Sequence, residues 1–170
     1  MLFGLAAIGS ICLAATLLVP GTAPAPSSVD PRVRGATPAV NTMLANGVRR
    51  SSTFARLVRA IDATDLIVYV EQISTMPAGL DGRLTFLTTA GGMRYLRVQV
   101  HTHVPKDDLI AVIGHELQHA LEVAENPSVR SSADLAVLYR LIGVQGASAD
   151  RFDTAAARSI GRRVRAELLN

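Results

Sequence analysis

The spacing of hydrophobic residues changes along the chain, and each change marks an expected boundary between helices and strands. Over residues 33–62, apolar side chains recur every three or four positions, as on one face of an amphipathic helix. Ser51 and Ser52 interrupt this pattern and offer a new N-cap, so the segment predicts two short helices or one kinked helix. Residues 66–73 are instead rich in β-branched residues and predict a strand. Residues 83–89 and 93–100 flank a Gly-Gly pair and predict a β-hairpin.

The longest apolar pattern, over residues 107–126, predicts a helix that is buried on most of its faces. Asp107 and Asp108 supply a capping residue and negative charge for the first turn. Asn126 and Pro127 supply the stop signal. A buried helix in this position forms the centre of the expected fold.

Two further helices are predicted after this one. The first is capped by Ser131 or Ser132 and ends at Ile142, and the second is capped by Ser148 and ends at about Leu168. The whole order predicts an α+β domain. A small, mostly antiparallel sheet of about three strands would pack on the helix 107–126, with further helices before and after it.

The N-terminal region differs in composition from the rest of the chain. An apolar run over residues 1–19 is followed by a segment rich in Pro, Ala and Ser. We therefore expect a signal peptide or N-terminal membrane anchor over residues 1–25, a flexible linker over 26–37 and the folded domain over 38–170. The protein is then exported, and is periplasmic, secreted or anchored to the membrane by its N-terminus. This N-terminal segment would engage the membrane or the export machinery.

Composition limits the function classes. The 170 residues, 49% of them hydrophobic, are enough for one domain. The net charge of +3 comes from arginines spread along the expected helices, and there is no Trp. Nucleic acid is therefore not an expected partner, because neither a basic cluster nor a set of aromatic residues for stacking is present. Cys12 is the only cysteine and lies in the apolar run, so the folded domain has no disulfide.

The candidate metal-binding and catalytic side chains are concentrated in the expected helix 107–126. His115 and His119 are four residues apart and project from the same side of the helix, so both imidazoles can bind one metal ion. Glu116 lies beside the first His and can reach a water on that metal without competing for it. The pattern H-E-x-x-H therefore predicts a metal site with Glu116 as the general base.

The sequence GHELQHALE, with Gly114 before the first His, resembles the active-site helix of the zincin metallopeptidases. In one zincin branch, the metzincins, a Gly and a further metal ligand follow the second His, but Glu122 and Glu125 stand at those places here. The chain is therefore more similar to the gluzincin-like branch, whose third ligand is a carboxylate from a later helix. The resemblance implies a minimal zincin-like fold, a Zn²⁺ cofactor and an edge strand that accepts an extended peptide.

The candidate for the third ligand is Asp153. The apolar face of the last expected helix runs through Ala157, Ile160 and Val164, and continuing it back by one turn leads to Asp153. A carboxylate on a buried face requires a partner. Its place in the chain also matches that of the third ligand in the family it resembles. Glu122 is the rival candidate on the motif helix itself, although a role in orienting a His suits it better.

Other candidate residues remain open. His101 and His103 form an H-x-H pair at the end of a strand, where a second metal is conceivable. Tyr95, Tyr139 and Arg140 are candidates for stabilising an oxyanion, and nothing in the sequence selects among them.

Two functions are consistent with these patterns. The first is an exported zinc metallopeptidase that hydrolyses peptide bonds, with His115, His119 and Asp153 as metal ligands, Glu116 as base, and a peptide or protein as substrate. The alternative is a non-catalytic exported protein that uses the same scaffold to bind a metal or a partner. Glu116 favours the first, because a purely structural metal site has no use for it.

Overall fold

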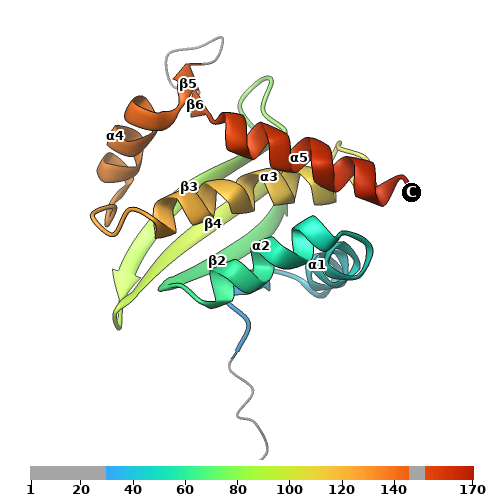
Figure 1. Ribbon diagram of the computed structural model, residues 1–170, viewed down its shortest axis with the longest axis horizontal. Helices are drawn as coiled ribbons and strands as arrows, with labels where there is room; N and C mark the ends of the chain where they lie inside the picture. Colours follow the sequence, from blue (N-terminus) through green and yellow to red (C-terminus); the bar gives the residue numbers. More distant parts are fainter. Residues whose placement is uncertain (1–29, 146–151) are drawn as a thin grey trace, which may run out of the picture.

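A computed structural model of the chain describes residues 30–145 and 152–170. Figure 1 shows its elements in chain order. The described residues form a four-stranded sheet, a separate pair of short strands and five helices. The apolar run over residues 1–19 lies outside the described residues, and no described helix has the length and apolar character needed to cross a membrane.

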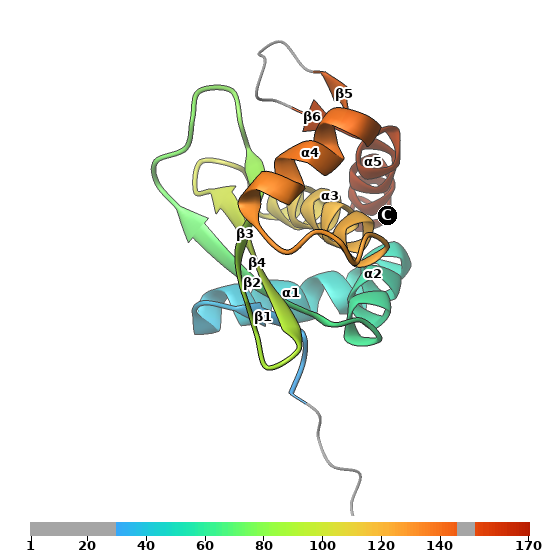
Figure 2. The ribbon, with the colours of Figure 1, turned by 90° about the vertical axis from the view of Figure 1, so that its left-hand side faces the viewer.

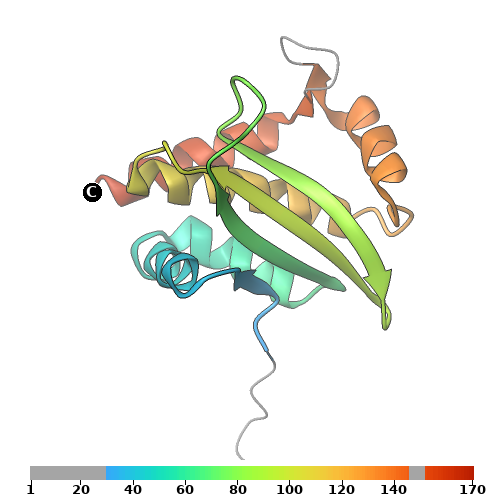
Figure 3. The same ribbon diagram turned by 180° about the vertical axis from the view of Figure 1, so that it is seen from behind.

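The main sheet is mixed, with the strand order β1-β2-β4-β3 (Figure 3). Strands β1 (Val33–Gly35) and β4 (Met93–His101) both run parallel to β2 (Leu66–Ile73). Strand β3 (Gly82–Ala90) is antiparallel to β4 and forms one edge. The prediction of about three mostly antiparallel strands was therefore wrong. Only the β3–β4 hairpin joins strands that directly follow one another in the sequence. The parallel β2–β4 pairing joins strands that are separated by β3 in the sequence, so no short sequence pattern predicts it.

Strand β1 also corrects the reading of the segment around residue 33. This segment was predicted to be helical, and residues 26–37 were predicted to be a flexible linker. Instead, Val33 pairs with Val68 and Gly35 pairs with Val70. Three residues are too few to display a period of two, so the neighbouring helical pattern concealed the strand.

The N-terminal helices are α1 (Pro38–Arg50) and α2 (Ser52–Asp62). Ser51 separates them, and its hydroxyl accepts a hydrogen bond from the Phe54 N–H at 3.0 Å. This cap confirms the predicted break at Ser51.

The motif helix α3 (Lys106–Ala124) lies between the sheet and the last helix, α5 (Ala155–Leu168) (Figure 2). Helix α4 (Ser132–Ile142) and two short paired strands, β5 (Val144–Gln145) and β6 (Phe152–Asp153), connect the two. Because α3 is covered on both sides, its predicted burial on most faces is confirmed. Leu96, Val98 and Val100 of β4 are fully buried in the core.

Two helix starts differ from the predictions. The N-cap position of α3 is Pro105, without a side-chain cap, so Asp107 and Asp108 lie in the first turn and do not cap it. The last helix begins only at Ala155, because Thr154 caps it and the chain before it forms β6. Ser148, the predicted cap, lies outside the described residues. Asp153 therefore precedes the helix.

The C-terminal end of α3 is held by the buried guanidinium of Arg94, which is 1% exposed. Its Nε and Nη2 donate to the Asp65 carboxylate at 2.8 and 2.7 Å. Its Nη1 donates to the carbonyl oxygens of Val123 and Asn126 at 2.8 and 3.0 Å. Because the last carbonyls of a helix have no partner within it, this side chain ties the end of α3 to the sheet.

Candidate metal centre

Helix α3 brings His115 and His119 together on the side that faces α5. Their Nε2 atoms lie 3.2 Å apart, and their ring centroids are 4.9 Å apart. His119 is buried and His115 is partly exposed. Two nitrogens this close share at most one proton or bind one cation. The two imidazoles that were predicted as ligands therefore direct their Nε2 atoms towards the same point.

Asp153 approaches the same point from β6. Its Oδ1 lies 3.3 Å from the Nε2 of His115 and 3.7 Å from the Nε2 of His119. This oxygen is buried and accepts no hydrogen bond from the described residues. Burying a carboxylate oxygen without a partner is costly unless a cation or a proton satisfies it. The position of Asp153 in front of the helix, and not within it, aims this oxygen at the two imidazoles.

The three donor atoms fit a small divalent cation. Within the described parts of the chain, they are the only group of three or more His, Cys, Asp or Glu ligand atoms close enough to hold one ion. The nearest point equidistant from the three atoms lies about 2.0 Å from each, so points just outside their plane match the Zn–N and Zn–O distances of about 2.0–2.2 Å. A cation bound by three protein ligands keeps a further position open on the side away from them.

The carboxylate of Glu122 binds the opposite side of the His119 ring and does not join the three donor atoms. Its Oε2 accepts a hydrogen bond from the Nδ1–H of His119 at 2.8 Å. This bond places the proton of His119 on Nδ1 and leaves the Nε2 lone pair directed at Asp153 and His115. The other Glu122 oxygen accepts a bond from the Thr154 hydroxyl at 2.6 Å, and Thr154 also caps α5. Glu122 therefore orients His119 and ties the face of α3 that carries the two His residues to the segment that carries Asp153.

The local charges set the protonation of these groups. Burial lowers the pKa of His115, and the neighbouring His119 lowers it further. Burial alone would also lower the pKa of His119, but its bond to Glu122 and the charge of Glu116 raise it overall. Burial would raise the pKa of Glu122, yet the bonds from His119 and Thr154 lower it. Glu122 is therefore a stable anion that supports a donor imidazole.

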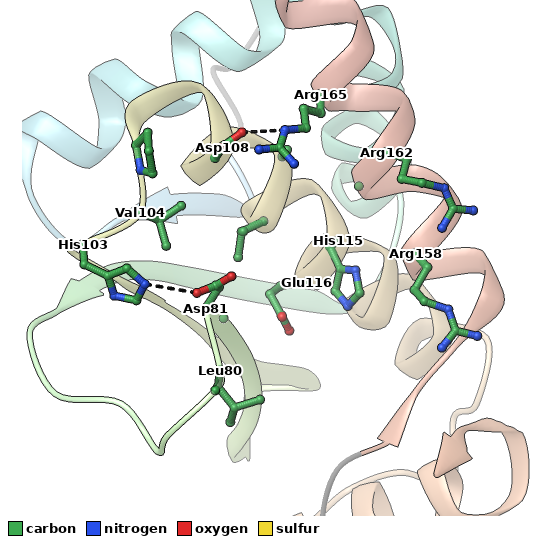
Figure 4. A pocket seen from close by; sticks show the side chains of 16 residues that line it. Leu80, Asp81, His103, Val104, Asp108, His115, Glu116, Arg158, Arg162 and Arg165 are labelled. Atoms are coloured by element: carbon green, nitrogen blue, oxygen red, sulfur yellow. Dashed lines mark ion pairs between the residues drawn. The ribbon is translucent and has the colours of Figure 1, made fainter. Parts of the chain in front are cut away.

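Glu116 lies beside this cluster and points into a cleft (Figure 4). Its side chain makes no hydrogen bond or ion pair with another described residue, and the residue is only 6% exposed. Burial raises the pKa of Glu116 to about 7. A carboxylate with this pKa can take up and release a proton near neutral pH, as a general base must.

Gly82, at the start of β3, leaves the room that Glu116 occupies. A Cβ atom at this position would lie 2.8 Å from Glu116 Oε1 and 2.6 Å from Val112 Cγ1. The sequence placed Gly82 only in a loop between strands, because the approach of β3 to α3 is a long-range contact. Thr154 was also missed, although a Thr before three alanines is a recognisable N-cap signal.

The cleft has a volume of about 490 Å³. Its floor is α3, with Ala111, Val112, His115 and Glu116. One wall is α5, and the other is formed by the loops at residues 79–82 and 103–105 (Figure 4). A peptide bound in this cleft would contact Glu116, which lines it.

The remaining candidates lie elsewhere. His103 lines the far side of the cleft, where its Nε2 lies 3.3 Å from Asp81 Oδ1. Its neighbour His101 does not complete a second metal-binding group with it among the described residues. The Tyr139 hydroxyl is buried and donates to the carbonyl of His119 at 3.1 Å. Neither Tyr95 nor Arg140 lines the cleft.

Comparisons of this chain with protein-family models, with curated proteins and with solved structures found no match. The arrangement of the residues themselves is therefore the basis for any functional conclusion.

Proposed function

We propose that this protein is a zinc-dependent peptidase of gluzincin-like type. His115, His119 and Asp153 hold the metal, and Glu116 is the general base. The observation that carries the proposal is the convergence of three donor atoms, one of them an unpartnered buried oxygen, next to a second buried carboxylate that faces a cleft. A structural metal site would need the first feature but not the second.

The chemistry divides between the metal and the chain. A zinc ion at this site supplies a Lewis acid, which polarises a peptide carbonyl and acidifies a water. Glu116 receives the proton of the attacking water and delivers it to the nitrogen of the leaving amine. Its buried position beside the three donor atoms, facing the cleft, supports this role. Glu122 keeps the His119 imidazole in the orientation that binding requires.

The substrate is a peptide in extended conformation. Strand β3 is an edge of the sheet, and its first residue, Gly82, lines the cleft beside Glu116. An extended peptide can add to such an edge through backbone hydrogen bonds. The hydroxyl of Ser132 donates to the Phe86 carbonyl at 3.3 Å, so α4 covers the edge further along. The first residues of β3, which are partly exposed, would thus lead a substrate past Glu116. The apolar run over residues 1–19 supports an exported location for this activity.

The test is to supply the purified chain with zinc and an unfolded protein substrate, and to count new amino termini by mass spectrometry. Glu116→Gln keeps the shape of the side chain but removes the proton acceptor. It should bind zinc normally and lose activity by about 100-fold or more. If the wild-type chain binds zinc but releases no fragments, the non-catalytic alternative is correct. If Glu116→Gln loses zinc, the assignment of Glu116 as base is wrong.

A further inference from the structure

Three arginines line one wall of the cleft. Arg158, Arg162 and Arg165 are spaced at i, i+4 and i+7 on α5, and all three border the cleft that contains His115 and Glu116 (Figure 4). This spacing places them on one face of the helix. The wall beside the metal-binding residues is therefore cationic.

Two of these arginines already have anionic neighbours. The Nε of Arg165 lies 2.7 Å from Asp108 Oδ1. The Nη1 of Arg158 lies 3.6 Å from Asp153 Oδ2, which is a longer contact. Arg162 is exposed and makes no hydrogen bond or ion pair with any described residue. Its guanidinium is free to bind an anion from outside the protein.

The wall lies against the metal-binding side chains. A Cβ atom at Gly161 would lie 3.3 Å from His115 Cβ, so α5 touches His115 directly before Arg162. Arg158 contacts one oxygen of Asp153 while the other oxygen faces the two imidazoles. An anionic group held by Arg162 and Arg158 would thus lie on the wall of the cleft that adjoins His115 and Asp153.

We propose that Arg162, with Arg158 beside it, binds a carboxylate of the peptide substrate close to the bond that is cleaved. Guanidinium groups bind carboxylates through two parallel hydrogen bonds and so fix orientation as well as charge. A peptide in this cleft offers two sources of such a carboxylate. One is the C-terminus of the peptide, and the other is an Asp or Glu side chain near the cleaved bond. The assignment rests on the proposed function, because it places a peptide in this cleft.

The test is equilibrium binding to the full-length, zinc-loaded Glu116→Gln protein at low salt, measured by calorimetry. Three peptides serve as probes: acetylated tetra-alanine with a free carboxylate, its C-terminal amide, and acetyl-Ala-Ala-Asp-Ala amide. A carboxylate peptide should bind about tenfold more tightly than the neutral amide. Preference for the free acid identifies the C-terminus as the source, and preference for the aspartyl amide identifies the side chain.

Arg162→Gln should remove most of this preference. Arg163→Gln is the matched control, since Arg163 is the next residue of the same helix, pairs with Glu167 at 3.6 Å and does not line the cleft. Equal binding of the three peptides, including no measurable binding of any of them, overturns the assignment. So does an equal loss of preference in the two variants.

Hydrolysis of the same peptides by the wild-type chain separates this proposal from the previous one. Binding with a carboxylate preference but without cleavage contradicts the peptidase and leaves the role of Arg162 standing. Cleavage without a carboxylate preference contradicts the role of Arg162 alone.

Discussion

Helix α3 carries two buried polar clusters that differ in how completely their groups are paired. At its C-terminal end, the Arg94 guanidinium donates to both oxygens of Asp65 and to several backbone carbonyls. In its middle, the Asp153 oxygen that faces His115 and His119 has no hydrogen-bond donor among the described residues. The side chain of Glu116, next to them, likewise has no described partner.

The contrast separates stability from function. A fully paired buried charge holds two elements together, and its loss leaves the buried carbonyl oxygens among its partners without a donor. A buried group left unpaired costs free energy in the absence of a ligand and is kept only where something else binds it. The Arg94 cluster therefore positions the helix, and the His115–His119–Asp153 cluster leaves donor atoms that a cation can satisfy.

The largest expected effect breaks the first cluster. Arg94→Met should lower the free energy of unfolding by about 3 kcal/mol, because the carbonyl oxygens of Val123, Asn126 and Val129 lose their shared donor. Asp153→Asn should change the stability of the metal-free protein by no more than about 0.5 kcal/mol, since the charge that it removes has only longer contacts of 3.3–3.7 Å with His115, His119 and Arg158. Urea denaturation with a chelator present measures both. A large loss with Asp153→Asn and none with Arg94→Met would reverse the contrast.

A smaller effect is expected from Gly82→Ala. The new methyl group must displace the carboxylate of Glu116 and the side chain of Val112, both of which can rotate without unfolding the protein. We expect kcat for peptide hydrolysis to fall by about 10- to 100-fold, while zinc content and KM stay nearly constant. Leu87→Ala is the control, because Leu87 lies on the same strand and is exposed. Loss of zinc from Gly82→Ala would show that Gly82 leaves space for the metal ligands and not for Glu116.

The smallest effect concerns Glu167, which joins the C-terminal end of α5 to the start of α2. Its carboxylate accepts hydrogen bonds from the Ser51 hydroxyl at 2.6 Å and from the N–H and hydroxyl of Thr53 at 2.9 and 2.7 Å. Burial would raise the pKa of Glu167, but these bonds lower it from 4.5 to about 2. The folded protein therefore favours the charged form more than the unfolded chain does.

Because the folded pKa is the lower one, this contribution is complete above about pH 4.5 and is lost as the pH falls towards 2. Glu167→Gln should cost about 1 kcal/mol at pH 7 and almost nothing near pH 2. Denaturation curves of the two proteins across this range measure the difference, with the exposed Glu125→Gln as control. A difference that is constant with pH would show that the charge of Glu167 contributes nothing.

The sequence predicted the parts of this molecule that depend on local patterns. Residues close together in the sequence determine the helical period of α3, the Gly-Gly hairpin and the break at Ser51. They also determine that His115 and His119 lie side by side. Contacts between residues that are distant in the chain could not be predicted from such patterns. The parallel pairing of β1 and β4 with β2, the cap that Arg94 provides and the space left by Gly82 all join residues that are distant in the chain. Asp153 was selected for a helical position, yet it reaches the two imidazoles from the strand before the helix.

The most direct measurement is the zinc affinity of the wild-type chain, Asp153→Ala and Glu122→Ala, determined by competition with a chelator. The wild-type protein should bind one equivalent. Asp153→Ala removes a donor atom and should bind far more weakly than Glu122→Ala, which should lose about 10- to 100-fold in affinity because it only releases the His119 imidazole. If Asp153→Ala binds zinc as the wild type does while Glu122→Ala loses it, the metal site is built on α3 alone and Asp153 is not a ligand.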